Sequence, residues 1–281
     1  TDEVKAGLFN QIEKDEQEMI DTLMELLRIP SVSNDMQMVE EALKFTLSQG
    51  SKMNFEVEFR ADGRVGVIEM GQGDEMLGIL THVDVVPPEP LDQWNTDPFE
   101  PQIIDGNIYA RGAIDDKGMV ISSLYAMKAV RSLGLPIKKK VQLIIGSQEE
   151  VKWTDMDAYV PSYRLPDYGF TPDGEFPILN IEKGVCDLRL EFEIGDKDER
   201  QDKAYVVSIT AGSANNVVPG SAEAILSDGT KIAAVGKIAH ASMPESGVNA
   251  IFELRKAIEK ANNGTLFLDE IGCLPLDTQK M

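Results

Sequence analysis

The sequence contains little cysteine and no long apolar run, and each scarcity excludes a class of protein. Its two cysteines, Cys186 and Cys273, lie far apart, which argues against a disulfide framework and fits a reducing cytoplasm. No stretch approaches the ~20 consecutive apolar residues of a membrane-spanning helix, so a membrane protein is not expected. The first four residues, Thr-Asp-Glu-Val, show no basic or apolar region of a secretory signal. We therefore expect a cytoplasmic protein.

Basic residues are also scarce relative to acidic ones. The chain has 27 Lys and Arg against 48 Asp and Glu, which gives a formal net charge of -21 at pH 7. Such a charge repels phosphate backbones, so nucleic-acid binding through a basic groove is not expected. Clustered carboxylates could instead hold cations. A length of 281 residues allows one large domain or two of ordinary size.

The first half of the chain has the pattern of an α/β sheet. Three-to-four spacing of apolar residues predicts helices over 4–28 and 35–47, and alternation predicts a hairpin of two strands, 55–59 and 65–70. Two near-continuous apolar runs farther along are typical of strands that are buried on both faces.

These two apolar runs, 76–86 and 140–145, flank a segment with helical periodicity, 117–133. Strand, helix and strand in that order predict a right-handed parallel crossover. In such sheets, functional residues lie where strands give way to loops.

After Gly184 the pattern changes to alternating segments. Strands are predicted over 185–194, 205–210 and 231–235, with a charged stretch, 195–203, between the first two. A helix is predicted over 245–260. Its candidate buried residues are Val248, Ile251, Phe252, Leu254 and Ile258. We therefore place a domain boundary near Gly184 and expect an α+β unit after it.

His82 and Asp84 stand two residues apart at the end of the first apolar run. In a strand such residues share a face, so the carboxylate could fix the orientation and tautomer of the imidazole. A metal-ligating histidine usually donates its other ring N–H to such a group. The alternative is a histidine packed in the core.

Two pairs of adjacent acids stand beside other elements. Asp115 and Asp116 come just before the predicted crossover helix, where exposed N–H groups favour carboxylates, although a helix cap would explain only one of them. Glu149 and Glu150 follow the second apolar strand at its carboxyl end, where they could line an active site or simply be solvated. Asp173 follows a proline, and its alternative is an ordinary turn aspartate.

Together these residues suit metal chemistry. One histidine and several carboxylates placed after separate elements supply ligands for Zn²⁺ or Mn²⁺. Two metals ~3.5–4 Å apart need a bridging carboxylate, and an unligated glutamate beside them could take a proton from bound water. No Gly-x-Ser-x-Gly elbow, cysteine–histidine pair or Gly-x-x-x-x-Gly-Lys-Ser/Thr loop offers a competing mechanism.

Several ordered segments match the motifs of a known enzyme family. They are 81–87 (THVDVVP), 94–100 (WNTDPFE), 109–118 (YARGAIDDKG), 146–150 (GSQEE) and 170–184 (FTPDGEFPILNIEKG). They closely resemble the clan MH metallopeptidases, which include aminoacylases, carnosinases and desuccinylases, and most closely the bacterial PepV-type dipeptidases. The resemblance implies a di-zinc exopeptidase fold, with an α/β catalytic domain whose sheet is mixed and mainly parallel, and an incomplete α+β lid domain.

The resemblance also implies a set of metal ligands, which are His82, Asp115, Glu150 and Asp173. Asp115 would bridge two divalent ions, with His82 and Asp173 on one and Glu150 on the other. Zinc is the metal that this family implies first, with manganese or cobalt as alternatives. Glu149 would be the general base and Asp84 would orient His82. The peptide between Asp115 and Asp116 would be cis.

Two segments of the second part resemble the family's substrate-contacting regions, 216–219 (NVVP) and 240–245 (HASMPE). By this resemblance Asn216 would contact substrate. His240 would polarise the scissile carbonyl or stabilise the oxyanion. The alternative for His240 is a surface-loop histidine.

The end of the chain resembles a different family. Dipeptidases of this type are longer and deliver a further metal-binding histidine after the lid, whereas no histidine follows His240 here. Segment 263–279 (NGTLFLDEIGCLPLDTQ) instead resembles the Walker B segment of sigma-factor-activating AAA+ ATPases. No Walker A loop accompanies it to hold phosphates. We interpret 261–281 as a foreign tail.

The sequence therefore predicts a metal-dependent dipeptidase with a catalytic domain at 1–184, its C-terminal part missing, and a partial lid at 185–260. A metal-bridging hydroxide would attack the carbonyl of a dipeptide or similar small amide, and Glu149 would move the proton to the leaving amine. Three alternatives stay open: an N-acyl-amino-acid amidohydrolase of the same family, a catalytically impaired metal-binding fragment, and, from the tail alone, a transcriptional ATPase.

Overall fold

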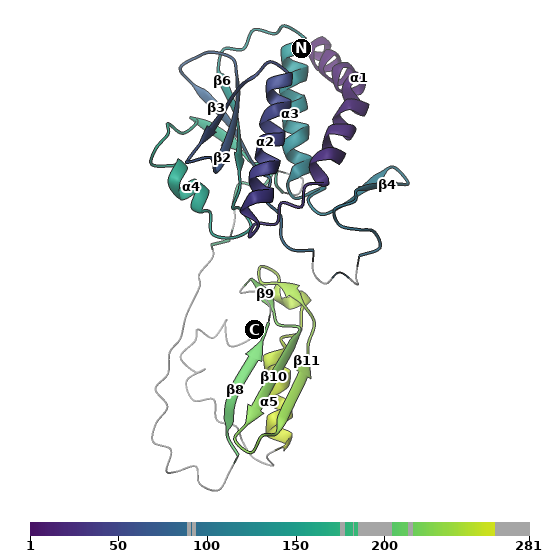
Figure 1. Ribbon diagram of the computed structural model, residues 1–281, viewed down its shortest axis with the longest axis vertical. Coiled ribbons are helices and arrows are strands. Elements are labelled where there is room, and N and C mark those ends of the chain that lie inside the picture. The colour runs from purple at the N-terminus through teal and green to yellow at the C-terminus, as the bar shows by residue number, and fades with distance from the viewer. Residues whose placement is uncertain are drawn as a thin grey trace. The chain divides into compact units, whose positions relative to one another are not determined.

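The computed structural model describes residues 1–88, 91, 94–174, 178–181, 183–184, 204–212 and 216–261. It divides the chain into two compact units, Thr1–Leu179 and Asn180–Met281, which are described separately (Figure 1). The predicted strand 185–194, the charged stretch 195–203, the tail segment 263–279 and both cysteines lie outside the described residues.

Three long helices form one layer of the first unit: α1 (Asp2–Leu27), α2 (Met36–Lys52) and α3 (Lys117–Ser132). All three confirm helices predicted from apolar spacing, and α2 extends beyond its predicted end at residue 47. The carboxylate of Asp35 caps α2 by accepting from the N–H of Met38 at 3.2 Å. Although α1 is 26 residues long, no helix in the described part of the chain has the length and apolar character to cross a membrane.

The helices cover a five-stranded mixed sheet of order β1-β2-β6-β3-β7. Its strands are β1 (Glu56–Arg60), β2 (Val65–Met70), β6 (Lys140–Gly146), β3 (Met76–His82) and β7 (Tyr168–Phe170). β1 and β2 form the predicted antiparallel hairpin. β3 runs parallel to both β6 and β7, and α3 connects β3 to β6, so the predicted parallel crossover is confirmed.

The two faces of this sheet are covered differently. Alternate residues such as Ile68, Leu143 and Ile145 face the main core, which α1, α2 and α3 complete (Figure 1). On the other face, Val67 and Ile144 pack near α4 (Thr154–Tyr159). The sequence does not predict α4 or β7, nor a small hairpin of β4 (Gln102–Ile104) with β5 (Asn107–Tyr109), because these elements are too short to show periodicity.

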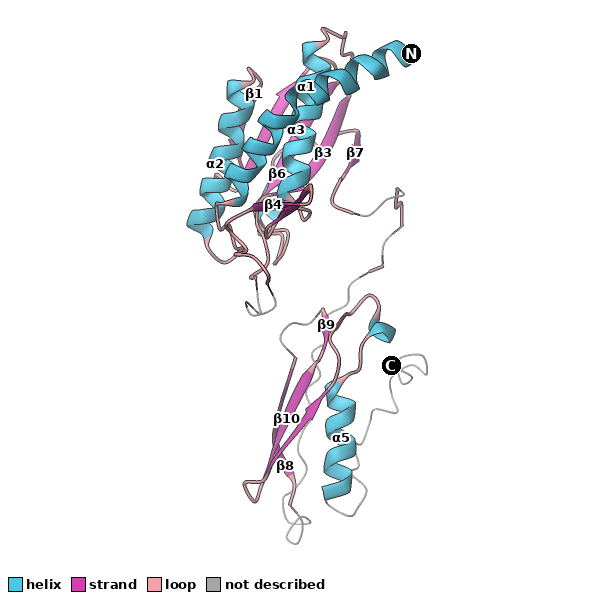
Figure 2. Cartoon of the chain, turned by 90° about the vertical axis from the view of Figure 1, so that its right-hand side faces the viewer, coloured by secondary structure: helices cyan, strands magenta, loops and turns pink. Residues whose placement is uncertain are grey.

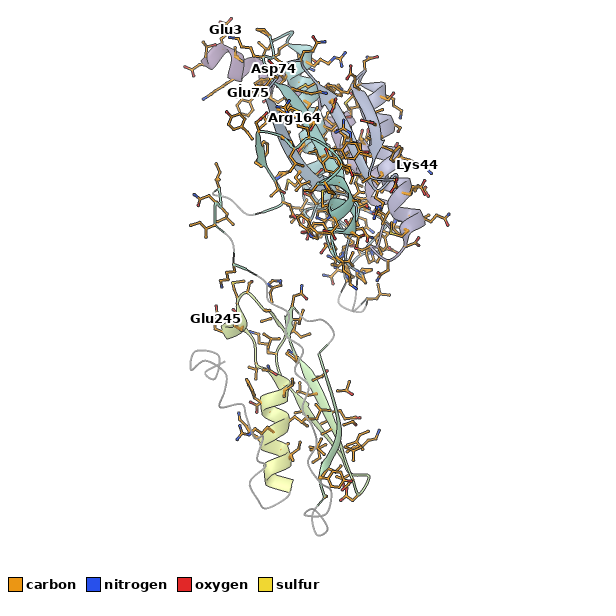
Figure 3. All side chains as sticks on the ribbon, turned by 90° about the vertical axis from the view of Figure 1, so that its left-hand side faces the viewer. Glu3, Lys44, Asp74, Glu75, Arg164 and Glu245 are labelled. Carbon is orange, nitrogen blue, oxygen red and sulfur yellow. The ribbon has the colours of Figure 1, made fainter. Side chains whose placement is uncertain are left out.

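Ionic contacts occupy the edge of the sheet where the parallel strands begin. Glu75 pairs with Lys139 and accepts from the Tyr168 hydroxyl at 3.0 Å. Arg164 donates to the main-chain oxygen of Asp74 at 2.7 Å, and Figure 3 shows Asp74, Glu75 and Arg164 at the same end of the first unit. The opposite edge, where the parallel strands end, carries the candidate chemistry.

The second unit contains a three-stranded antiparallel sheet of order β11-β10-β8. Its strands are β8 (Val206–Ala211), β10 (Ser221–Leu226) and β11 (Lys231–Val235), and helix α5 (Ala250–Ala261) packs beside them (Figure 2). β8 and β11 confirm predicted strands, whereas β10 was missed. A shorter ladder joins β9 (Val217–Val218) to β12 (Ala239–His240).

The predicted start of the last helix, at residue 245, is wrong. A short 3₁₀ turn, η3 (Pro244–Ser246), comes first, and Val248 then exchanges two backbone hydrogen bonds with Lys237, at 2.8 and 2.9 Å. The helix can begin only after this bridge, so α5 starts at Ala250.

The predicted buried side of α5 is correct only in part. Leu254 and Ile258 are buried with Ala250 in a row that faces the sheet, four residues apart. Val248, which precedes the helix, and Ile251 and Phe252 are exposed.

Candidate functional site

Three neighbouring parallel strands bring the candidate residues to one edge of the sheet. His82 is the last residue of β3, Glu149 and Glu150 follow the end of β6, and Asp173 follows β7. The crossover helix α3 begins just after Asp115 and Asp116. Because parallel strands end at the same edge, residues far apart in sequence meet there.

The Nε2 atom of His82 faces several carboxylates. It lies 3.1 Å from Asp115 Oδ1, 3.5 Å from Asp173 Oδ2 and 3.9 Å from Glu149 Oε2. His82 is 2% exposed, yet its Nε2 makes no hydrogen bond within the described residues. A histidine packed only for stability would have this buried atom paired.

Potential ligand atoms gather in two groups that share His82. One group combines it with Asp115 and Asp173, and the other with Glu149 and Glu150, with ligand atoms within 4.8 Å of one another in each group. The structure therefore brings the four predicted ligands and the predicted base together. A nitrogen and several carboxylate oxygens fit a divalent cation such as zinc or manganese.

The other ring nitrogen of His82 contacts Asp84. Nδ1 lies 2.9 Å from the main-chain oxygen of Asp84 and 3.3 Å from its Oδ1. Both oxygens are acceptors, so Nδ1 carries a proton. β3 ends at His82, so Asp84 lies outside the strand in which it was expected, but its carboxylate still faces the ring as predicted. Asp84 lies in the following segment, where Val85 N–H donates to the main-chain oxygen of Ser31 at 3.0 Å.

Asp84 is fully buried and connects several parts of the site. It accepts from the backbone N–H of Glu149 at 3.1 Å, from that of Glu150 at 3.3 Å and from the Ser33 hydroxyl at 2.8 Å. Burial favours the neutral acid, but hydrogen bonds from His82 and Ser33 outweigh it and lower the pKa of Asp84. The sequence does not predict a role for Ser33, because its partner Asp84 is 51 residues away.

Asp116 has a role that the sequence did not reveal. The Asp115–Asp116 peptide is cis, as the resemblance implies. Asp116 occupies the N-cap position of α3, but its side chain makes no capping bond, and Oδ2 instead accepts from the N–H of His82 at 2.9 Å. The capping alternative therefore fails for Asp116. Burial, together with the nearby charges of Asp173 and Asp115, outweighs the stabilising contact with His82 and raises its pKa to about 8.

Crowding of the acids shifts their proton affinities. Burial, then the negative charge of Asp115, raises the pKa of Glu150 to about 7. Burial also raises the pKa of Glu149. Burial opposes the charged form of His82, but the close carboxylates of Asp115 and Asp173 outweigh it and raise the pKa of the imidazole. A divalent cation would relieve the repulsion between these carboxylates and would take the place of a proton on His82.

Two further candidate residues lie together in the second unit. The N–H of Ala241 donates to the main-chain oxygen of Asn216 at 2.7 Å, beside the ladder of β9 and β12 that ends at His240. Nδ1 of His240 accepts from the N–H of Ser242 at 3.2 Å and lies 2.6 Å from its hydroxyl. The proton of the neutral ring is therefore on Nε2, which makes this atom a hydrogen-bond donor.

The sequence of this chain matches a known protein family. The model of Peptidase family M20/M25/M40 matches residues 78–261, more than half of the chain. The chain belongs to this family. A Bacillus subtilis (strain 168) relative, named "Putative dipeptidase YtjP", is 39% identical over 225 residues, covering 77% of this chain and 48% of the relative. A similarly named Staphylococcus haemolyticus relative is 35% identical, covering 76% and 47%. The chain thus spans about half the length of the curated relatives it matches.

Solved structures show the same fold for part of this M20 chain. The dipeptidase Dug1p of Saccharomyces cerevisiae aligns with a TM-score of 0.50 and 21% identity, over 55% of this chain and 37% of that one. Human carnosine dipeptidase 1 aligns with a TM-score of 0.50 and 25% identity over the same shares. The mixed α/β fold expected from the sequence is therefore that of M20 peptidase catalytic domains. The finer likeness to PepV-type enzymes remains a prediction, as does the likeness of the tail to AAA+ ATPases.

Proposed function

We propose that this chain carries the metal-binding centre of a metal-dependent dipeptidase. The observation that carries the proposal is the buried Nε2 of His82, which makes no hydrogen bond within the described residues and faces carboxylates from three other segments. Membership of a peptidase family and the names of its relatives support a peptide substrate. In this proposal residues 1–184 form the catalytic part and residues 185–260 belong to a lid.

The ligands proposed for two divalent ions are His82, Asp115, Glu150 and Asp173. Asp115 would bridge the ions. We propose zinc, with manganese and cobalt as alternatives, because the ligand set combines imidazole nitrogen with carboxylate oxygen. Bound ions would polarise the scissile carbonyl and make a water molecule more acidic.

Glu149 would be the general base. Its carboxylate lies at the edge of the site, 3.9 Å from His82 Nε2, and is partly open to solvent. Burial raises its pKa, which suits a group that accepts a proton from water and then passes it to the leaving amine. Asp84 would hold His82 in the tautomer that offers Nε2 to a metal.

The second unit would supply substrate contacts. His240 presents an Nε2 donor that could hydrogen-bond to the carbonyl oxygen of the scissile bond as negative charge develops there. Asn216 lies beside it and would bind substrate through its amide.

The test uses the full chain, freed of metal and then supplied with Zn²⁺, Mn²⁺ or Co²⁺. We expect the rate of alanyl-alanine cleavage, measured as free alanine, to exceed the rate of N-acetylalanine deacylation, measured as acetate. Faster release of acetate would favour the amidohydrolase alternative. Firm metal binding with neither reaction would indicate a catalytically impaired fragment.

A further inference from the structure

We propose that Ser33 is a positioning residue of the metal site, acting through Asp84. This inference rests on the proposed metal site but not on any particular substrate. Ser33 is 3% exposed, and its hydroxyl lies 2.8 Å from Asp84 Oδ2 and 3.3 Å from the main-chain oxygen of Val85. A hydroxyl has one proton, and the shorter contact to a charged acceptor is the stronger. Ser33 therefore donates to Asp84.

The carboxylate that Ser33 contacts connects the ligands of the two proposed metals. Oδ1 of Asp84 faces His82 and accepts from Glu149 N–H, whereas Oδ2 accepts from Glu150 N–H at 3.3 Å and from Ser33. Without the Ser33 hydroxyl, Oδ2 would keep a single contact, the 3.3 Å hydrogen bond from the N–H of Glu150. The buried carboxylate would then be freer to rotate, and rotation would move His82 relative to the loop that carries Glu150.

The backbone of Ser33 is held by two hydrogen bonds, and the chain just before it is held by a third. Its N–H donates to Val85 at 3.1 Å, and its main-chain oxygen accepts from Gln148 Nε2 at 3.2 Å. The fully buried Lys117 donates to the main-chain oxygen of Ile29 at 2.6 Å, which ties the start of this segment to α3. The hydroxyl thus has a fixed position from which to orient Asp84.

Ser31 provides a matched control in the same segment. It is also fully buried, and its hydroxyl donates to the main-chain oxygen of Val83 at 2.6 Å, so Ser31→Ala also deletes one buried hydrogen bond. This bond does not reach Asp84. A purely structural role would make the two alanine variants equivalent.

The experiment titrates metal-free full-length chain with Co²⁺ and records affinity and the visible absorption band, which reports ligand geometry. We expect Ser33→Ala to weaken Co²⁺ binding about tenfold and to shift the band, as removal of groups behind metal ligands commonly does. Ser31→Ala should leave both unchanged. Ser33→Thr, which keeps the hydroxyl, should restore the original spectrum.

Equal Co²⁺ affinities and spectra for Ser33→Ala and Ser31→Ala would overturn the inference, whether both variants differ from the unchanged chain or neither does. If Ser33→Ala does not fold, Ser33→Cys keeps the shape of the side chain with a weaker hydrogen-bond donor and should still shift the absorption band relative to the unchanged chain. An unchanged spectrum would refute the role. Failure of the proposed function looks different, since the unchanged chain would then bind Co²⁺ and cleave no dipeptide.

Discussion

The Nδ1 atom of His82 lies 2.9 Å from the main-chain oxygen of Asp84. This contact keeps a proton on Nδ1 and leaves Nε2 to face the carboxylates. His240 has the opposite arrangement, because its Nδ1 accepts from the backbone N–H of Ser242. The chain's two histidines therefore suit different tasks, one as a metal ligand and the other as a hydrogen-bond donor.

This difference can be read directly by nitrogen-15 NMR of the two side chains. In metal-free chain at neutral pH, we expect His82 to carry protons on both ring nitrogens, because its carboxylate neighbours raise its pKa. Zn²⁺ should remove only the Nε2 proton. Zn²⁺ should leave both ring nitrogens of His240 unchanged. A zinc-induced shift at Nδ1 of His82 instead of Nε2 would contradict the assignment.

Glu149→Gln should separate catalysis from metal binding. An amide cannot accept the proton, so we expect turnover of a dipeptide to fall about 10²- to 10⁴-fold with nearly unchanged zinc affinity. His82→Ala is the comparison, because it should lose metal. If Glu149→Gln lost metal to the same degree, Glu149 would have to be reassigned as a ligand.

Gly118→Ala should disturb the start of α3. A Cβ at this position would lie 2.1 Å from the main-chain oxygen of Ala113, so the turn that carries Asp115 would have to move. We expect a loss of about 1–3 kcal/mol in the free energy of unfolding, together with weaker metal binding. Gly184→Ala, where a Cβ meets nothing within 4 Å, should change neither. Urea unfolding and metal titration of both variants check this expectation.

Glu69 should make part of the stability depend on pH. Its burial opposes ionisation, but hydrogen bonds from Lys140 and Gln142 and the charge of Arg60 outweigh it and lower the pKa of Glu69 from 4.5. The stabilisation is therefore present above pH 4.5 and is lost as the pH falls through the folded-state pKa.

Glu69→Gln removes this ionisable group while keeping its size. The urea midpoint of the unchanged chain should exceed that of the variant at about pH 7, and the gap should narrow at about pH 3. A difference in urea midpoint that stayed constant between the two pH values would show that the charge of Glu69 does not contribute to stability.

Much of the first unit follows from local pattern. The helices and the long strands show clear apolar spacing, and a parallel crossover requires β3 and β6 to end at one edge of the sheet. That rule, applied to the sequence alone, places His82 near Glu149 and Glu150. By contrast, β7 has three residues, too few for periodicity, and its pairing with β3 is what brings Asp173 to His82.

In the second unit, the sequence contains a local signal for the turn between β10 and β11. Asp228-Gly229 lies between β10 and β11, and Gly229 has a φ of +86°, as is common for glycine in hairpin turns. The burial of α5 could not be read in the same way, because its face is chosen by contact with the sheet. Phe252 is exposed and Ala250 is buried, although the side chain of Phe252 is much the larger and more hydrophobic of the two.

The sequence by itself determined which ligand types the site contains and in what order they follow the strands, because residue chemistry and strand order are local properties. Only the tertiary structure decided that Asp116 supports the backbone of His82 instead of capping α3, and that Ser33 donates to Asp84. The partner of a buried polar group is whichever residue the folded chain brings within hydrogen-bond distance. For these two pairs that residue lies 34 and 51 positions away, beyond the reach of any local pattern.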